Sequence, residues 1–362
     1  MDYKLEKEVV KRKEKQTTIV EIKQNNNATK EEFLSILKLV SPGTQLRTAI
    51  DGIVDAKKGG LVVIENSNVY KVLDGGFRIN ARFTPQRLLE LAKMDGAIIL
   101  SNDLKRIIYA NVTLAPEIKI ASQETGTRHK AAERTAKMTG ALSIAISERK
   151  NQIYLYYKDL KYHLQEKTEI LRRATETLQI LEKQRELFDN YLERLNFHEI
   201  FNDLNLAQAA KVIQKGKTMQ KIIEANERTL IELGNEAIAL KFRIREIMKG
   251  VERETDLVIK DYTKLNLKKS KTLLNNLNYE EITDIENIIL ALAQNLNNPI
   301  TSLNGYRLLS KTCLTDDEIN KMLKEFNNVN NILNGEAKHY VKIIGEEKSI
   351  VLKKEIERIK NQ

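Results

Sequence analysis

Apolar and polar positions along the chain follow two different periods. Between residues 29 and 157, short apolar runs alternate with stretches whose apolar residues recur every three or four positions. The runs predict strands over 61–64, 69–73, 97–100, 107–112, 142–146 and 153–157. The amphipathic stretches predict helices after Thr44, over 86–94 and over 127–138. Helices between short β-rich runs are typical of an α/β domain with a mixed sheet flanked by helices.

The pattern becomes helical from residue 158 onward. One series at seven-residue spacing, broken at Arg185, contains Leu164, Leu171, Leu178 and Leu192. A second series, three residues later, contains Ala174, Leu181, Phe188 and Leu195. These series predict a seam between packed helices, and we expect an all-α spine over 158–288 that carries no chemistry.

The two ends of the chain differ from these parts. Residues 289–362 contain Pro299, Gly305, Gly335 and Gly345, which predict short helices joined by tight turns, ending in a basic helix over 349–360. Residues 1–28 are polar and are predicted to be a loosely held N-terminal extension. The sequence therefore predicts four parts: 1–28, 29–157, 158–288 and 289–362.

Composition narrows the class of protein. Cys313 is the only cysteine, which excludes an intramolecular disulfide or a cysteine-cluster metal site and favours a reducing, cytoplasmic compartment. No apolar run of about 18 residues occurs, so we expect no membrane partner. Sixty basic against 50 acidic residues give a net charge of +10, which favours polyanionic partners such as nucleotides or DNA.

A cationic turn is the first candidate for chemistry. Thr127 is a plausible helix N-cap, which places Arg128, His129 and Lys130 in the first helical turn. The helix dipole disfavours cations there, whereas a bound phosphate would reverse that balance and accept the free backbone N–H groups. The alternative is that Glu124 and Glu133 neutralise these cations and no ligand binds.

An Asp-Gly turn is the second candidate. Asp95-Gly96 precedes a predicted strand, and loops at strand ends are where α/β domains bind ligands. Asp95 offers a hard oxygen for Mg²⁺ or Mn²⁺, and Gly96 leaves room for a ligand. An ordinary turn is the alternative. The chain has no Walker A motif, Rossmann GxGxxG fingerprint or kinase signature, so the common nucleotide folds are not indicated.

The same segments carry a resemblance to a known family. PGTQLRTAIDGIVDAKKGGLVVI, the DGA at 95–97, NVTLAP at 111–116 and GTRHKAAER at 126–134 resemble the diadenylate cyclase domain. The segments at 231–262 and 305–326 resemble the helical spine and the C-terminal helix-hairpin-helix module of the DNA integrity scanning protein family, DisA. The resemblance runs from about residue 30 to the end of the chain.

The resemblance implies an enzyme that condenses two ATP molecules into cyclic di-AMP and two pyrophosphates. Asp95 would hold the Mg²⁺ or Mn²⁺, and Gly96 and Leu114 would line the ATP pocket. Thr127, Arg128, His129, Lys130 and Ala131 would surround the phosphates, with Arg128 and His129 catalytic beside Asp95. Each half-site holds one ATP, so two protomers would meet face to face within a homo-octamer.

Two substitutions in the phosphate segment depart from the family pattern. The usual Arg-His-Arg-Thr reads Arg128-His129-Lys130-Ala131 here. Lysine keeps the charge but loses the bidentate fork, and alanine loses a hydroxyl. The alternative function is therefore a catalytically weak or inactive DNA-binding or scaffold oligomer with a degenerate nucleotide pocket.

The C-terminal module implies a second activity. Helix-hairpin-helix motifs hold DNA phosphates through backbone N–H groups and nearby cations, without reading sequence. Here Lys342, Gly345 and Lys348 are the candidate contacts, although Ile343 stands where the family usually has glycine. The resemblance implies branched or damaged DNA as partner, binding that throttles the cyclase, and a cytoplasmic, nucleoid-associated location. A pure packing module is the alternative.

Overall fold

The computed structural model describes residues 28–201, 203–294, 303 and 305–360. The predicted N-terminal extension therefore lies outside the described residues, except for Ala28. The chain divides into two compact units. The first ends at Ile170 and also contains residues 231–236, and the second contains 171–230 and the residues after 236. Each unit is described by itself.

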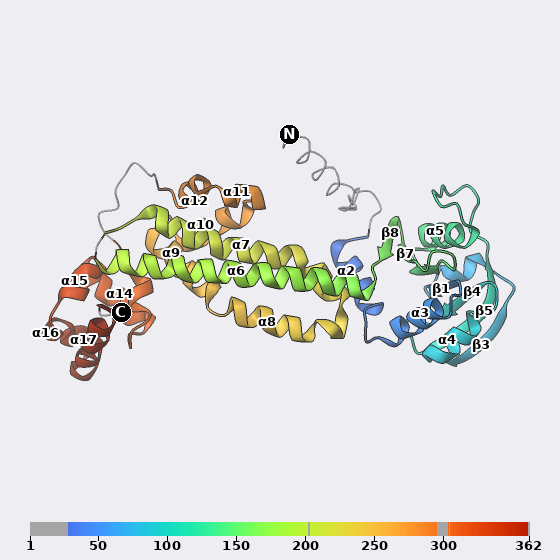
Figure 1. Cartoon of the computed structure of the whole chain (residues 1–362), viewed down its shortest axis with the longest axis horizontal. Coiled ribbons are helices and arrows are strands. Elements are labelled where there is room, and N and C mark those ends of the chain that lie inside the picture. The colour runs from blue at the N-terminus through green and yellow to red at the C-terminus, as the bar shows by residue number, and fades with distance from the viewer. Residues whose placement is uncertain (1–27, 202, 295–302, 304, 361–362) are drawn as a thin grey trace, which may run out of the picture. The chain divides into compact units, whose positions relative to one another are not determined.

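The first unit is built on an eight-stranded sheet in the order β2-β5-β4-β1-β6-β7-β8, with β3 paired to β5 (Figure 1). Its strands are β1 (Gly60–Ile64), β2 (Leu73–Asp74), β3 (Phe77–Arg82), β4 (Ala97–Leu100), β5 (Arg106–Leu114), β6 (Ser143–Ile146), β7 (Ile153–Tyr157) and β8 (Leu160–Leu164). β1 and β4 run parallel, and the other pairs are antiparallel. The predicted mixed sheet is confirmed.

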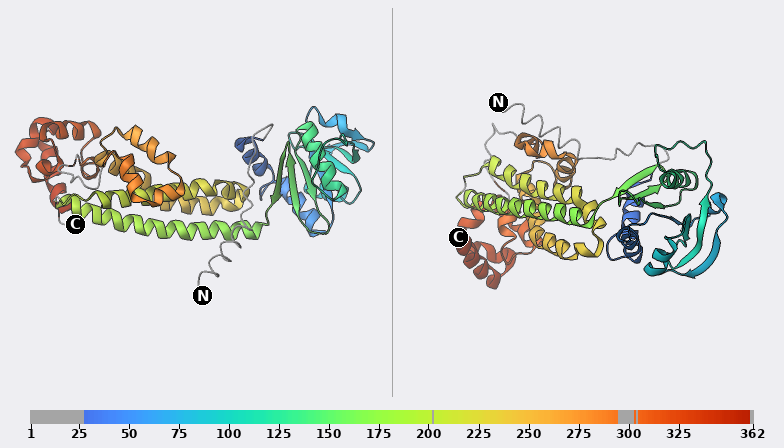
Figure 2. Two further views of the ribbon diagram at one scale, coloured as in Figure 1. Left: turned by 90° about the horizontal axis from the view of Figure 1, so that it is seen from above. Right: turned by 45° about the vertical axis from the view of Figure 1, so that its right-hand side comes forward.

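Helices cover both faces of this sheet because β1 is apolar on both sides. Val62 and Ile64 pack on the face with α2 (Lys30–Leu39), α3 (Gln45–Asp55) and α4 (Pro85–Leu91). Leu61 and Val63 pack on the face with α5 (Thr127–Thr139). Figures 1 and 2 show the sheet between α5 and the α3–α4 pair.

Two predicted helix starts are confirmed in detail. Thr44 accepts the backbone N–H of Arg47 at 3.1 Å and begins α3. Thr84 accepts the backbone N–H of Arg87 at 3.3 Å, and Pro85 occupies the first turn of α4. Such caps satisfy N–H groups that the helix itself leaves free, so they can be recognised from local sequence.

The predicted strand over 69–73 is wrong. Residues Val69–Val72 form a 3-10 helix, and only Leu73–Asp74 pairs as β2. The reason is local, because the Asn66 Oδ1 accepts the backbone N–H groups of Asn68 and Val69, both at 3.0 Å, and turns the chain.

Two strands were not predicted. β3 alternates polar and partly buried residues, and its arginines and asparagine hide the pattern. β8 lies where helix was expected from residue 158, because Tyr162 and Leu164 are buried while Lys161 and His163 face the other side. The sheet therefore continues beyond residue 157, and α6 begins only at Lys167.

The second unit is helical. Its first part contains α8 (Ile238–Met248), α9 (Val251–Tyr262), α10 (Leu267–Asn276), α11 (Tyr279–Thr283) and α12 (Ile285–Ala291), with most of α6 (Lys167–Ile200) and α7 (Leu206–Glu232). The first residues of α6, the last two of α7 and all of η2 (Gly234–Ala237) except Ala237 belong to the first unit. In α6, the predicted series Ala174, Leu181, Phe188 and Leu195 is buried. The first two members of the other series do not form part of a buried helical seam. Leu164 lies in strand β8, and Leu171 is 40% exposed.

The break at Arg185 has a structural reason. Its guanidinium donates to the carbonyl oxygens of Ile247 and Lys249, at 2.5 and 2.8 Å, where α8 ends. Helix ends leave carbonyls without intrahelical partners, so Arg185 satisfies them from the neighbouring helix.

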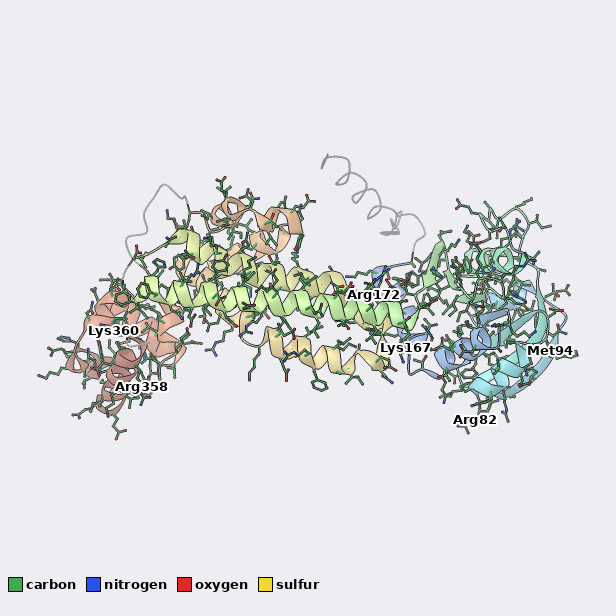
Figure 3. The ribbon with its side chains drawn as sticks, viewed as in Figure 1. Arg82, Met94, Lys167, Arg172, Arg358 and Lys360 are labelled. Carbon is green, nitrogen blue, oxygen red and sulfur yellow. The ribbon has the colours of Figure 1, made fainter. Side chains whose placement is uncertain are left out.

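Short helices follow in the C-terminal part, as predicted: α13 (Tyr306–Leu309), α14 (Asp316–Phe326), α15 (Val329–Asn334), α16 (Ala337–Ile344) and α17 (Glu346–Lys360). Arg358 and Lys360 lie at the end of α17 (Figure 3). Among the described residues, no helix combines the length and apolar character needed to cross a membrane.

Candidate nucleotide site at one edge of the sheet

Several strand ends meet at one edge of the sheet. β1 and β4 are parallel, with Val62 opposite Ile98, so the same register carried back places Gly60 opposite Gly96. β6 is antiparallel to β1, and its last residue, Ile146, pairs with Gly60. This edge, which we call the β1–β4 edge, therefore gathers the predicted Asp95-Gly96 turn and the start of β1.

The same strand pairing places two further residues, one of them the predicted Leu114, at this edge. β5 runs antiparallel to β4 with Val112 opposite Ala97, so Leu114 ends β5 at the β1–β4 edge. Leu114 is partly buried and pairs with Leu73 of β2. Ser147 comes directly after β6 and reaches the same edge. The role of Leu114 in lining an ATP pocket stays a prediction.

The cationic turn begins α5, with one correction to the prediction. Gly126 is the N-cap, with φ −83° and ψ 140°, and Thr127 is the first helical residue. Thr127 does not cap because its backbone is already helical, and no side chain caps this helix. The first intrahelical bond runs from the Lys130 N–H to the Gly126 carbonyl at 2.8 Å. The N–H groups of Thr127, Arg128 and His129 thus remain for an acceptor outside the helix.

Arg128 brings this turn to the β1–β4 edge. A Cβ atom on Gly59 would lie 2.0 Å from the Arg128 Nη1, so the guanidinium lies directly against the Gly59 backbone. Gly59 immediately precedes β1, which starts beside the Asp95-Gly96 turn. The structure therefore brings the predicted carboxylate and the predicted cationic turn to the same edge. Gly59 was not among the predicted site residues, although a Gly-Gly pair directly before a buried strand marks close approach of another group.

The carboxylates near the turn are engaged elsewhere. Glu124 accepts the Tyr156 hydroxyl at 2.9 Å and pairs with Lys161 at 2.5 Å. Glu133 pairs with Lys137 at 2.7 Å and accepts the Ser122 hydroxyl. Among the described residues, Arg128 and Lys130 have no ion pair. The alternative in which Glu124 and Glu133 neutralise them is therefore not supported, and the turn keeps its positive charge.

His129 is half-buried beside Tyr154, with ring centroids 5.5 Å apart. Burial lowers the pKa of His129, while the Glu124 charge acts in the opposite direction. The imidazole is therefore mostly neutral at pH 7, with one N–H to donate. Ala131, which was also predicted to lie beside the phosphates, packs partly against the apolar cluster on the α5 face.

Asp95 is exposed, and within the described part of the chain its carboxylate makes no hydrogen bond or ion pair. No group of three metal-binding side chains exists among the described residues. This donor set fits Mg²⁺ or Mn²⁺ held by one carboxylate together with phosphate oxygens and water, because such ions keep several non-protein ligands.

The backbone geometry at position 96 requires glycine. Its φ is +90°, and a Cβ atom would lie 2.8–2.9 Å from backbone atoms of Asn111 and Val112 in β5. The turn and the close approach of β5 both require glycine here. Any larger residue would displace the Asp95 turn from β5.

A separate cavity lies between β3 and α4, on the sheet face opposite α5. Its volume is about 370 Å³, and its lining includes Ile79, Ala81, Leu91 and Ile107. Arg82, which ends β3 nearby, extends into solvent (Figure 3). The lining is mostly apolar, and its one cation, Arg87, shares it with the carboxylate of Glu90. The cavity also lies on the sheet face opposite the cationic turn of α5, so it is not the candidate nucleotide site.

The three predicted DNA contacts lie around the turn between α16 and α17. Gly345 forms this turn with φ +82°, and Lys342 is exposed. Lys348 is already paired, since its Nζ lies 2.6 Å from the Glu318 carboxylate and holds the pKa of Glu318 down at about 2. Ile343 packs partly against the core of the second unit. Lys342 is therefore exposed and available to a phosphate, whereas the Lys348 ammonium already forms an ion pair with Glu318.

Comparison with known proteins adds the family. The model described as "DisA bacterial checkpoint controller nucleotide-binding" matches residues 47–160, and that described as "DisA bacterial checkpoint controller linker region" matches residues 164–300. DNA integrity scanning protein DisA from Clostridium beijerinckii is 37% identical, covering 91% of this chain and 95% of the relative. DisA from Clostridioides difficile is 38% identical, covering 91% and 95%. The chain belongs to the DisA family.

Proposed function

We propose that this diadenylate cyclase joins two ATP molecules into cyclic di-AMP, with release of two pyrophosphates, where two copies of the chain meet face to face. The 3′-hydroxyl of each ATP attacks the α-phosphate of the other, and the bond from that phosphate to pyrophosphate breaks. Each copy contributes one β1–β4 edge with its bound ATP. A single copy holds only half of the reacting atoms.

Different residues at the β1–β4 edge bind the phosphates and the metal. The free N–H groups of the first α5 turn donate to phosphate oxygens, and Arg128 and Lys130 neutralise the phosphate charge. His129 donates a hydrogen bond to a phosphate oxygen. Asp95 holds a divalent metal, Mg²⁺ or Mn²⁺, which polarises the phosphate oxygens and makes the 3′-hydroxyl more acidic when bound.

This chemistry needs no dedicated protein nucleophile, because the attacking group belongs to the substrate. In-line placement of the hydroxyl and neutralisation of transition-state charge supply most of the acceleration. The observation that carries the proposal is the meeting of the Asp95 turn and the Arg128 turn at one sheet edge, through Gly59 and the parallel β1–β4 pair.

The test is an incubation of the full chain with ATP and Mn²⁺, followed by chromatographic identification of the products. The proposal expects cyclic di-AMP and pyrophosphate in a one-to-two ratio. Unchanged ATP, or ADP as the only product, would favour the alternative of an inactive scaffold with a degenerate pocket.

The two family departures give a further prediction. Lys130→Arg with Ala131→Thr restores the planar guanidinium fork and the hydroxyl, so we expect cyclic di-AMP synthesis to rise by about tenfold at subsaturating ATP. Lys137→Arg, on the same helix but paired with Glu133, serves as the control and should change little. Equal turnover of the double variant and the parent, at low and high ATP, would refute the idea of a weakened site.

A second function concerns the C-terminal helices, which we propose to be a helix-hairpin-helix module that holds the phosphates of branched or damaged DNA. The free N–H groups near Gly345 and the exposed Lys342 are the contacts, and the relatives' name refers to DNA integrity. DNA bound here would throttle the cyclase, within a homo-octamer located at the nucleoid.

Binding led by phosphates predicts a salt dependence. Affinity for a four-way DNA junction should fall steeply with salt, with a log–log slope of about 0.9 per phosphate contact. Lys342→Ala should reduce that slope by about 1, whereas Lys105→Ala in the first unit should not. Fluorescence anisotropy across a salt series measures both. An affinity that does not respond to salt would rule out this mode.

A further inference from the structure

A stack of aromatic and histidine rings lies beside the cationic turn. The Tyr154 ring meets the His129 ring edge-on, with centroids 5.5 Å apart and an interplanar angle of 79°. On its other side, Tyr154 lies 5.0 Å from His163, its cross-strand partner on β8. The three rings thus connect the edge strand β8 to the first turn of α5.

Tyr154 is fixed from several directions. The Lys161 Nζ lies 5.0 Å from the centre of its ring, and Lys161 is itself held by Glu124. The ring of Tyr156 stacks 6.4 Å away, and the Tyr156 hydroxyl also bonds to Glu124. The Tyr154 hydroxyl donates to the Gln152 Oε1 at 3.2 Å. These contacts restrict the orientation of the Tyr154 ring.

His129, by contrast, has no hydrogen bond to any described residue. Its two neighbours on α5, Arg128 and Lys130, carry positive charge and give the imidazole no acceptor. Its ring orientation therefore depends on packing, and Tyr154 supplies an edge-to-face contact of favourable geometry. A catalytic group whose ring turns freely loses much of its effect, because displacements of about 1 Å can cost 10²-fold in rate.

We propose that Tyr154 is a positioning residue for the cyclase reaction: its ring, held by His163 and Lys161, fixes the His129 imidazole toward the phosphate at the α5 N-terminus. This rests on the proposed function, in which His129 contacts that phosphate. Tyr154 itself touches neither substrate nor metal, so it acts through His129 alone.

A double-mutant cycle on the full chain tests this role. Tyr154→Leu should lower kcat for cyclic di-AMP by about 10-fold to 100-fold, with less than about a twofold change in KM for ATP. Tyr154→Phe keeps the ring and should restore kcat. In a His129→Ala background, Tyr154→Leu should have no further effect. Tyr157→Leu is the matched control, since Tyr157 lies on the same strand but faces away from α5. An equal loss from Tyr154→Leu in both backgrounds would overturn the proposal.

A spectroscopic measurement keeps the result independent of turnover. The chain has only four histidines, so ¹³C-labelled ring signals can be assigned by substitution. The His129 ring signal should move in Tyr154→Leu and stay in place in Tyr154→Phe. An unmoved signal in Tyr154→Leu would overturn the positioning role. If the parent chain makes no cyclic di-AMP but the His129 signal behaves as expected, the proposed function fails while the ring contact stands.

Discussion

Asp95→Asn is expected to lower cyclic di-AMP synthesis by about 10²–10³-fold, the usual cost of removing one group that stabilises charge in a transition state. The exposed carboxylate at the β1–β4 edge makes no bond within the described chain, so asparagine changes its charge without disturbing a contact. The fold should therefore persist, with the same thermal midpoint. Product formation from ATP and Mn²⁺ over time measures the loss.

Asp103→Asn is the matched control for that experiment. Asp103 follows the same strand, β4, but at its opposite end, and its carboxylate accepts the Ser101 hydroxyl at 2.6 Å. It lies far from the proposed phosphates along the strand, so activity should stay within about twofold of the parent. Equal activity of Asp95→Asn and the parent would remove Asp95 from the site.

The second large effect is expected at Arg307, which is fully buried in the second unit. Its guanidinium pairs with Glu199, which is also fully buried and accepts the Tyr262 hydroxyl at 3.1 Å. Arg307→Met leaves the Glu199 charge without its partner, which costs about 3–5 kcal/mol in the free energy of unfolding. Urea unfolding of the full chain, followed by far-ultraviolet circular dichroism, measures the loss in this helical unit.

The pair also predicts how the loss is recovered. Replacing both members, with Arg307→Met and Glu199→Leu together, removes the buried charge and should return most of the lost stability. Asp261 provides a second anchor, because its carboxylate accepts the N–H groups of Tyr306 and Arg307, at 2.7 and 2.9 Å, where α13 begins. A double variant as unstable as Arg307→Met alone would contradict this account of the pair.

The sequence predicted those elements whose causes are local. α3 and α4 begin at threonine caps, and β1 and β4 are uninterrupted apolar runs, so each was predicted close to its observed position. β8 was missed although it pairs with the preceding strand β7, because Leu164 was assigned to the helical series that follows. β3 was missed because polar residues hide its pattern and its partner, β5, comes later in the chain. Strand pairing is non-local, and short patterns do not determine it.

In the candidate site, too, the sequence predicted the local features but not the contacts between distant segments. Asp95 and Arg128 were predicted from residue type and from a family resemblance. Their meeting at one edge depends on the parallel β1–β4 pair and on the contact between Arg128 and Gly59, which no short motif records. Tyr154 was read only as part of a strand, since its contact with His129 crosses from β7 to α5.

The most direct test is a crystal structure of the chain with 3′-deoxy-ATP and Mn²⁺, because this analogue lacks the attacking hydroxyl and cannot react. We expect the triphosphate against the N–H groups of residues 127–129, with Arg128 beside it and Mn²⁺ between Asp95 and the phosphates. A triphosphate bound away from the β1–β4 edge, or a metal that does not touch Asp95, would contradict the account.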